Sequence, residues 1–224
     1  MARRLLIKFV SSLLWGYVVK NILLMASGLA LVGTLGIAPA SASALLSLNK
    51  PVTCSGYYDS GSEVFPCSNV DNGQTGDTGS PYNWSFWLSP QSTTAGQSVT
   101  IDLGSVDAIS QITVEDTHNR GYYDRGTQDF TIGVSNNGVD FTTVVTSAFT
   151  VAEWENLTDV TFDLATTGQY VQFTAVGPDS CYGCQSIGLN DMSVFGSTVV
   201  PEPASMTLLV VGFLGLGLSR YRHA

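Results

Sequence analysis

One short segment of the chain gathers basic, polar and aromatic side chains that could bind a ligand. His118-Asn119-Arg120-Gly121-Tyr122-Tyr123 places an imidazole and a guanidinium group beside two tyrosine rings. Planar nitrogen donors bind hydroxyl groups, and an aromatic face packs against the C–H side of a sugar ring. Tyr58 stands in another predicted loop as a further aromatic candidate. The arginines could instead pair with acids such as Asp116 and Asp124, and this alternative stays open.

Signals for catalysis are missing around this segment. His118 is the only histidine between residues 45 and 199, and the region contains no G-x-S-x-G, H-E-x-x-H or phosphate-cradling glycine loop. A pair of carboxylates can hydrolyse a glycosidic bond, but a chance pair among so many acids is uninformative. We therefore expect a binding module without catalytic activity.

All four cysteines also lie between residues 45 and 199. In an oxidising compartment disulfides are the default, and four cysteines allow three pairings. We favour Cys54 with Cys67, which closes a small loop, and Cys181 with Cys184, which closes a C-x-x-C ring. A redox site at the second pair lacks the βαβ context of such sites, and a zinc site lacks the paired C-x-x-C spacing.

The charge of this region excludes one class of partner. The only basic residues between positions 45 and 199 are Lys50, Arg120 and Arg125, whereas all of the 18 acidic residues except Glu202 lie there. The net charge is therefore 3 − 17 = −14, which repels phosphate backbones. Nucleic acid is not an expected partner.

Apolar residues occupy every second position in several runs of this region. Such alternation is typical of half-buried antiparallel strands, and turn signals such as Asn136-Asn137-Gly138 and Thr167-Gly168 separate the runs. No run has a helical period. We expect an all-β antiparallel sandwich or jelly roll, flanked by an N-terminal signal helix and a short C-terminal hydrophobic helix. The alternating apolar residues are Val99, Ile101 and Leu103; Ile112 and Val114; Phe130, Ile132 and Val134; Val160, Phe162 and Leu164; and Val171, Phe173 and Ala175.

Five phrases of the same region resemble a known domain family when they are taken in order. They are Asn49-Lys50-Pro51-Val52-Thr53, Val99 to Gly104, Phe130 to Phe141, Tyr170-Val171-Gln172-Phe173 and Leu189 to Gly196. The set resembles the discoidin domain, also called the coagulation-factor type C domain, of the galactose-binding-like jelly rolls. This resemblance implies an eight-stranded sandwich whose loops at one end bind a ligand, most often a glycan. The acidic, glycine-rich stretch 71–79 departs from the family, as does Phe141, where tryptophan is frequent.

The resemblance also implies a structural Ca²⁺. Many glycan-binding relatives hold the ion between a loop near the domain start and an acidic residue on the last strand. The matching residues are Asp71 and Asp191, and Asp77 and Thr78 offer further oxygens from the same loop. Ca²⁺ takes six to eight oxygen ligands, including backbone carbonyls. These acidic side chains could instead simply form Asx-turns.

The two ends of the 224-residue chain carry export signals. Residues 1–44 combine basic residues, an apolar stretch and a small-residue Ala-x-Ala site, which predicts a cleaved signal peptide rather than an N-terminal anchor. Residues 199–224 contain Pro201-Glu202-Pro203, the apolar run Met206 to Leu218, and two basic residues after it. This tail resembles the PEP-CTERM sorting signal of Gram-negative bacteria. That resemblance implies processing by an exosortase-type enzyme, with the tail held transiently in the inner membrane; a plain C-terminal anchor is the alternative.

Together these observations predict three parts: a signal peptide (1–44), a discoidin-like β-sandwich (45–198) and a sorting tail (199–224). We expect a protein secreted to the cell surface or extracellular matrix that binds polysaccharide or another matrix glycan. The alternative is a structural matrix or biofilm protein with no specific ligand.

Overall fold

The computed structural model describes residues 43–176, 181–183 and 185–198. The predicted signal helix, the C-terminal helix with its sorting motif, and Cys184 lie outside these residues. Within the described part of the chain, no helix is both long and apolar enough to cross a membrane. The described elements are β1 (Ala44–Leu45), β2 (Val52–Cys54), β3 (Tyr58–Asp59), β4 (Val64–Phe65), η1 (Cys67–Asp71), β5 (Gly79–Ser80), β6 (Asn83–Trp84), β7 (Trp87–Leu88), β8 (Ser98–Glu115), η2 (Arg120–Tyr122), β9 (Asp129–Ser135), β10 (Thr142–Ala148), α2 (Val151–Asn156), β11 (Val160–Ala175), β12 (Gly188–Leu189) and β13 (Asp191–Thr198).

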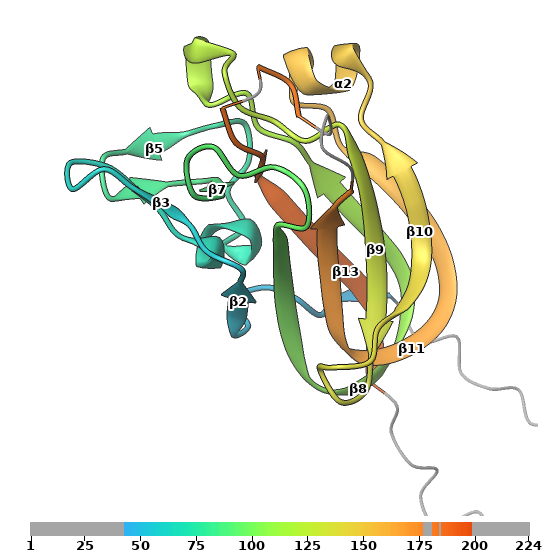
Figure 1. The fold of residues 1–224 in the computed structure, drawn as a ribbon. Coiled ribbons are helices and arrows are strands. Elements are labelled where there is room, and N and C mark those ends of the chain that lie inside the picture. The colour runs from blue at the N-terminus through green and yellow to red at the C-terminus, as the bar shows by residue number, and fades with distance from the viewer. Residues whose placement is uncertain (1–42, 177–180, 184, 199–224) are drawn as a thin grey trace, which may run out of the picture. The chain divides into compact units, whose positions relative to one another are not determined.

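Two long antiparallel strands, β8 and β11, build both layers of a sandwich because each of them bends in the middle (Figure 1). In the first arm of β8, Ile101 lies opposite Val171 of β11, and β2 pairs on the other side. In the second arm, Val114 lies between Val160 of β11 and Met192 of β13. Strands β9 and β10 extend the first layer next to β11, and β1 extends the second layer next to β13. The predicted antiparallel β-sandwich is confirmed.

The sandwich has two distinct ends. We call the end where β8 and β11 bend and β9 turns into β10 the bend end, and the opposite end the loop end; the loop end carries η2 and α2 (Figure 1). Strand β13 begins at the loop end, where Asp191 lies opposite Glu115, and Thr198 lies opposite Asp107 at the bend end. The chain therefore leaves the sandwich at the bend end.

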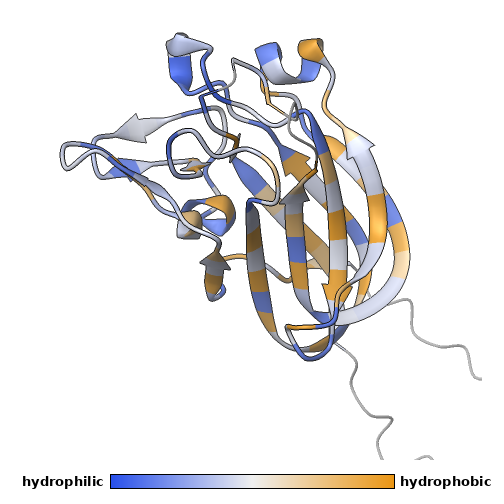
Figure 2. Cartoon of the chain, viewed as in Figure 1, coloured by the Kyte–Doolittle hydropathy of each residue, from blue (hydrophilic) through white to orange (hydrophobic). Residues whose placement is uncertain are grey.

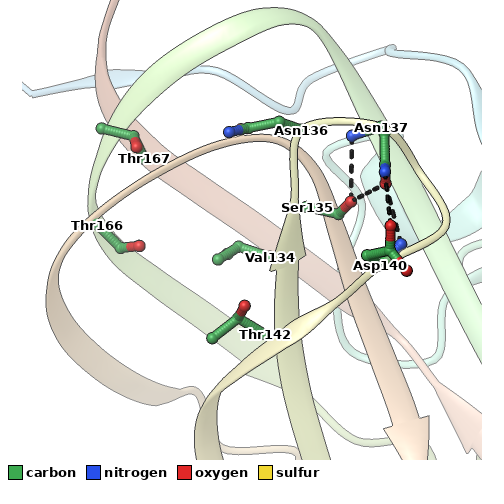
Figure 3. Close-up of a pocket in the computed structure, with 8 residues that line it drawn as sticks. All are labelled: Val134, Ser135, Asn136, Asn137, Asp140, Thr142, Thr166 and Thr167. Atoms are coloured by element: carbon green, nitrogen blue, oxygen red, sulfur yellow. Dashed lines mark hydrogen bonds between the residues drawn. The ribbon is translucent and has the colours of Figure 1, made fainter.

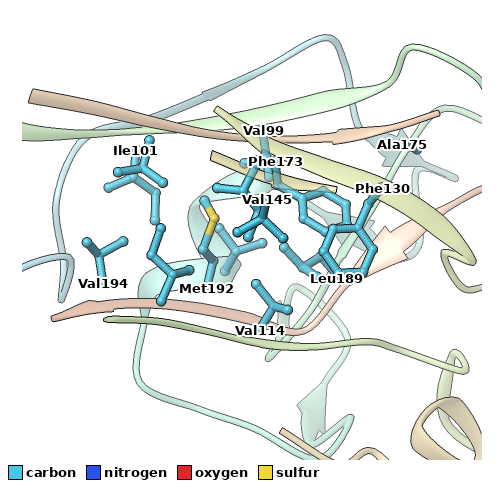
Figure 4. Packing of buried hydrophobic residues seen from close by; sticks show 14 of the residues in the cluster. Val99, Ile101, Val114, Phe130, Val145, Phe173, Ala175, Leu189, Met192 and Val194 are labelled. Carbon is cyan, nitrogen blue, oxygen red and sulfur yellow. The ribbon is translucent and has the colours of Figure 1, made fainter. Parts of the chain in front are cut away.

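The core lies between the two layers and follows the predicted alternation. Figure 2 shows hydrophobic and hydrophilic residues alternating along β8, β9 and β13. Phe130 packs next to Phe173 in this core (Figure 4), with its ring 4.9 Å from that of Phe173 and 4.8 Å from that of Phe149. Trp84 and Trp87 are also buried, as expected for packing residues rather than for a sugar platform.

Three local features differ from the sequence-based expectations. The runs 99–103 and 112–114 belong to one strand, β8, and the runs 160–164 and 171–175 both belong to β11. Thr167-Gly168 is consequently a bend within β11 and not a turn between strands. A short helix, α2, was not predicted; it begins with a capping box in which Thr150 and Glu153 each accept a backbone N–H of the other.

The disulfide between Cys54 and Cys67 is present as predicted. It joins the end of β2 to the start of η1 and closes a loop that contains the β3–β4 hairpin, including Tyr58 and Glu63. The second predicted pair involves Cys184, which lies outside the described residues, so that pairing stays a prediction.

Replacing both Cys54 and Cys67 with serine should lower the free energy of unfolding by about 3 kcal/mol, because the cross-link restricts the unfolded chain. Urea unfolding under non-reducing conditions measures the change, and Ser68→Ala in the same segment serves as the control. An unchanged unfolding midpoint in the double variant would show that the hairpin region is held in place without the cross-link.

Candidate functional site

A pocket of about 180 Å³ lies where the β3–β4 hairpin faces the η2 segment. We call it the arginine pocket because two of the three basic residues between positions 45 and 199 line it. Strands β4 and β7 supply its apolar floor, and the polar groups come from the hairpin and from the loop between β8 and β9. Its lining residues are Tyr58, Glu63, Phe65, Leu88, Asn119, Arg120, Tyr122, Asp124 and Arg125.

The guanidinium group of Arg120 is held between aromatic rings. Its Cζ atom lies 4.1 Å from the ring centroid of Trp84 and 5.0 Å from that of Tyr122. Its Nη1 lies 3.4 Å from Oε1 of Glu63, across the pocket on the hairpin. Stacking on two rings and an ion pair restrict the side chain, so the guanidinium group is already oriented before any ligand arrives.

Arg125 is buried on the other side of the pocket. Its Nη1 donates to Oδ2 of Asp124 at 2.8 Å, and Asn119 Nδ2 donates to the other carboxylate oxygen of Asp124 at 2.8 Å. Among the described residues, Nε of Arg120, Nε of Arg125 and Oδ1 of Asn119 are buried without a hydrogen-bond partner. Buried polar groups are normally paired, so these atoms are available for a ligand or for ordered water.

The buried carboxylate of Asp77 holds the part of the loop that carries Arg120. Its Oδ2 accepts the backbone N–H groups of His118 (3.1 Å) and Arg120 (2.7 Å), and its Oδ1 accepts Thr117 Oγ1 (2.6 Å) and Asn190 Nδ2 (3.2 Å). Asn119 and Arg120 both have positive φ values, +56° and +62°, which are unfavourable for residues other than glycine. The hydrogen bonds to Asp77 offset this backbone strain.

A second buried acid, Asp116, closes the base of the same loop. Its carboxylate accepts the backbone N–H groups of Thr117 and Thr127, and burial raises the pKa of Asp116 well above its usual range. Trp154 of α2 donates its indole N–H to the backbone oxygens of Thr117 and Arg125. Both ends of the loop are thus attached to the sandwich, and the unpredicted helix contributes one of these attachments.

Three of the five predicted ligand residues, Tyr58, Arg120 and Tyr122, come together in the pocket. His118 and Tyr123 do not line it. Nδ1 of His118 lies 3.1 Å from Oδ2 of Asp77, and the imidazole stacks on Tyr123 with ring centroids 4.5 Å apart. The hydrogen bond to Asp77 raises the pKa of His118. These two residues therefore stabilise the loop without lining the pocket.

Four polar residues of the pocket were not predicted as ligand residues: Glu63, Asn119, Asp124 and Arg125. Asp124 and Arg125 were considered as salt-bridge partners, and they are indeed paired with each other. Glu63 is distant in sequence from Arg120, and only the folded hairpin brings the two together. The loop length between Cys54 and Cys67 is the one signal that could have placed Glu63 near a site.

Of the four residues predicted to bind a metal ion, Asp77 and Thr78 instead form hydrogen bonds within the protein. The oxygens of Asp77 are occupied by protein donors, and Thr78 donates its hydroxyl to the backbone oxygen of Thr75. Asp71 accepts the backbone N–H of Lys50 at 2.7 Å. Burial raises the pKa of Asp71 to about 6, and burial together with the charges of Asp159 and Asp71 raises the pKa of Asp191 to about 6. The described residues contain no group of three acidic, histidine or cysteine side chains that could hold a metal ion.

Asp77→Asn should lower the free energy of unfolding by about 3 kcal/mol and loosen the loop, because an amide is a weaker acceptor and turns an N–H₂ group toward the donors. Urea unfolding measures the first effect, and hydrogen exchange of the amides of residues 117–120 measures the second. Asp129→Asn, at an exposed position, is the matched control. Unchanged exchange at these amides would mean that the loop is held by other contacts.

Residues 51–187 match the F5/8 type C domain, and residues 199–222 match the PEP-CTERM protein-sorting motif. This motif indicates export to the cell surface or secretion, with processing by an exosortase. No curated protein matches the chain.

Solved structures of bacterial sugar-binding modules share the fold. A module from Clostridium perfringens in complex with GalNAc-β-1,3-galactose is 16% identical, with a TM-score of 0.53, and covers 68% of this chain and 100% of its own. The family 32 carbohydrate-binding module of NanJ from C. perfringens, in complex with galactose, is 17% identical (TM-score 0.51; 68% and 98% covered). A fucose-binding module from Streptococcus pneumoniae is 15% identical (TM-score 0.51; 70% and 98% covered).

At these identities the structural similarity concerns the fold alone, whereas the sequence match spans more than half of the chain. The match begins just before β2 and ends just before β12, so it includes both long bent strands and every residue that lines the arginine pocket. The protein belongs to the F5/8 type C domain family.

Proposed function

We propose that the protein is an exported, non-catalytic module that binds an extracellular polysaccharide or another matrix glycan in the arginine pocket. The observation that carries this proposal is the set of buried, unpartnered polar atoms on Asn119, Arg120 and Arg125 around one pocket. Two of these residues, Asn119 and Arg125, are less than one-tenth exposed, so water reaches them poorly. Unpaired buried polar atoms are rare and costly, and a ligand or ordered water that reached them from the pocket would relieve that cost.

The pocket supplies both kinds of contact that a sugar needs. Guanidinium nitrogens donate to hydroxyl oxygens, and the carboxylates of Glu63 and Asp124 accept hydroxyl protons. Tyr122 is 67% exposed, so its ring remains available for packing against a sugar ring. A vicinal pair of hydroxyl groups can bridge a guanidinium group and a carboxylate at the same time.

The charge balance of the pocket favours a neutral sugar. Each arginine is already paired with an acid, Arg120 with Glu63 and Arg125 with Asp124. The pocket thus has no net charge, and it sits in a region of charge −14 that repels anions. The related solved modules bind galactose, GalNAc-β-1,3-galactose and fucose, which are neutral sugars of this class.

A structural Ca²⁺ between Asp71 and Asp191 remains part of the proposal. Both side chains are buried acids without a basic partner among the described residues, and η1, which ends at Asp71, contacts β13, which begins at Asp191. A divalent cation would neutralise both, with backbone carbonyls supplying the further oxygens it requires. Asp77 and Thr78, whose oxygens bond within the protein, are left out of this ligand set.

The export route completes the proposal. Residues 1–44 act as a cleaved signal peptide, and residues 199–224 are held transiently in the inner membrane of a Gram-negative bacterium until an exosortase-type enzyme processes them. The match to the sorting motif at residues 199–222 supports the second step. The domain boundaries at residues 44 and 198 follow from these signals, and β1 and β13 begin and end close to them.

Arg120→Ala should weaken glycan binding by about tenfold or more, because it removes a donor and the group that holds Tyr122 in place. The full chain is first screened against an array of neutral and acidic glycans, and the best ligand is titrated by calorimetry. Lys50→Ala, which removes a positive charge outside the pocket, should bind like the unmodified protein. If no glycan binds, or if both variants bind equally well, the arginine pocket is not the site, and the structural matrix role is favoured.

Calcium should stabilise the protein more at about pH 8 than at about pH 5. The pKa values of Asp71, Asp191 and Glu115 are raised in the fold to about 6, 6 and 7. Because the folded protein holds these protons more tightly than the unfolded chain, protonation of the acids stabilises the fold. This stabilisation is complete below the unfolded-state pKa, near 4, and is lost as the pH rises through the folded-state pKa values. In a chelator the melting temperature should therefore be higher at about pH 5 than at about pH 8, and Ca²⁺ should reverse the loss.

Asp71→Asn should abolish the response to calcium, and Asp163→Asn, at an exposed position of β11, should retain it. A calcium response of equal size in both variants would remove Asp71 from the ligand set. The absence of any response in the unmodified protein at about pH 8 would contradict the calcium proposal while leaving glycan binding untouched.

A further inference from the structure

We propose that the protein has a second saccharide-binding site, at the bend end of the sandwich, opposite to the arginine pocket. A pocket of about 340 Å³ is formed there by the last residues of β9, the β9–β10 turn, the start of β10 and the bend of β11 (Figure 3). We call it the threonine pocket, because Thr142, Thr166 and Thr167 line it. The site does not depend on the function proposed for the arginine pocket.

The turn that forms one wall of the pocket is rigid. Asn137 Oδ1 accepts the hydroxyl of Ser135 and the backbone N–H groups of Val139 and Asp140, all at 2.9 Å. Asn137 Nδ2 donates to Oδ2 of Asp140 at 2.8 Å, and Ser135 Oγ accepts the N–H of Gly138 at 3.0 Å (Figure 3). The wall therefore needs little ordering when a ligand binds, which lowers the entropic cost of binding.

Four other polar side chains of this pocket have no hydrogen-bond partner among the described residues of the protein. In the described part of the chain, the side chains of Asn136, Thr142, Thr166 and Thr167 make no hydrogen bond, although they surround one hollow (Figure 3). They come from three segments that are separate in sequence. Hydroxyl groups can donate and accept, and the Asn136 amide does both through different atoms. The pocket thus offers a cluster of neutral groups without internal partners.

The chemistry of the lining identifies the class of ligand. Asp140 is the only charged residue that lines the pocket, so an anion finds no cation there. The lining contains no aromatic ring on which a flat heterocycle could stack. Val134 forms a small apolar floor that is almost fully buried. A neutral saccharide presents both hydroxyl groups and C–H edges, so it fits this combination. The volume admits one or two of its sugar units.

The two pockets lie far apart. Strand β13 runs the length of the sandwich between the two ends, and its eight residues span roughly 25 Å. No residue lines both pockets. A saccharide can therefore occupy the threonine pocket whether or not the arginine pocket is filled, and a protein with both sites would bridge two glycan chains.

The test uses ¹H–¹⁵N spectra of the full chain during titration with neutral oligosaccharides of glucose, mannose and galactose, with polygalacturonate as the anionic comparison. The same titration is repeated in Arg120→Ala, which disables the arginine pocket. We expect the amides of residues 134–142 and 166–167 to shift with at least one neutral oligosaccharide in both proteins. Asn136→Ala and Thr142→Val should each weaken this binding by about tenfold, the effect of losing one or two hydrogen bonds.

Thr146→Val is the matched control, because Thr146 is an exposed threonine on the same strand, outside the pocket. It should bind with unchanged affinity. The proposal is overturned if these amides do not shift at about 50 mM saccharide, well above the range of weak binding. It is equally overturned if shifts occur only around the arginine pocket, or if Thr146→Val weakens binding as much as Thr142→Val. If saccharides do not bind in the arginine pocket, the amides at the bend end should still shift.

Discussion

The buried carboxylate of Asp77 is the interaction on which the loop end of this protein depends. It accepts four hydrogen bonds, from two backbone amides, a hydroxyl and an amide side chain, and it faces the imidazole of His118. A buried charge is costly unless it is fully paired, so these contacts are mutually dependent. Through them the strained backbone of Asn119 and Arg120 is held in one conformation, and the guanidinium group of Arg120 is directed into the pocket.

The acids and bases of the module are distributed unevenly. Two of its three basic residues occupy one pocket, whereas the buried acids Asp71, Glu115 and Asp191 lie together with no basic partner among the described residues. In the arginine pocket, the charges are balanced by ion pairs. Around the three buried acids, the negative charge is balanced only by protonation or by a bound cation.

The strands could be predicted from sequence because burial on one face imposes a period of two, as Val99, Ile101 and Leu103 illustrate. That period does not show whether two neighbouring runs belong to one strand, so the bent strands β8 and β11 were each predicted as two strands. The helix α2 has only six residues, too few for a period, and its capping box at Thr150 was the available signal.

The site was predictable only where its residues are adjacent in sequence. Arg120 and Tyr122 were found because they share a segment, but their distance from Glu63 is set by the hairpin and the disulfide. Asp77 was predicted as a metal ligand because an acid in a glycine-rich loop suits calcium equally well. Only the fold shows that its oxygens face the amides of residues 118 and 120.

The direction of β13 has a mechanical consequence. A tether attached beyond Thr198 would pull on the bend end, while a glycan held in the arginine pocket would resist at the loop end. The load would then run along β13 and lie across the hydrogen bonds that join it to β8, since these bonds are perpendicular to the strands. All bonds of the ladder would share the force in shear instead of opening one after another.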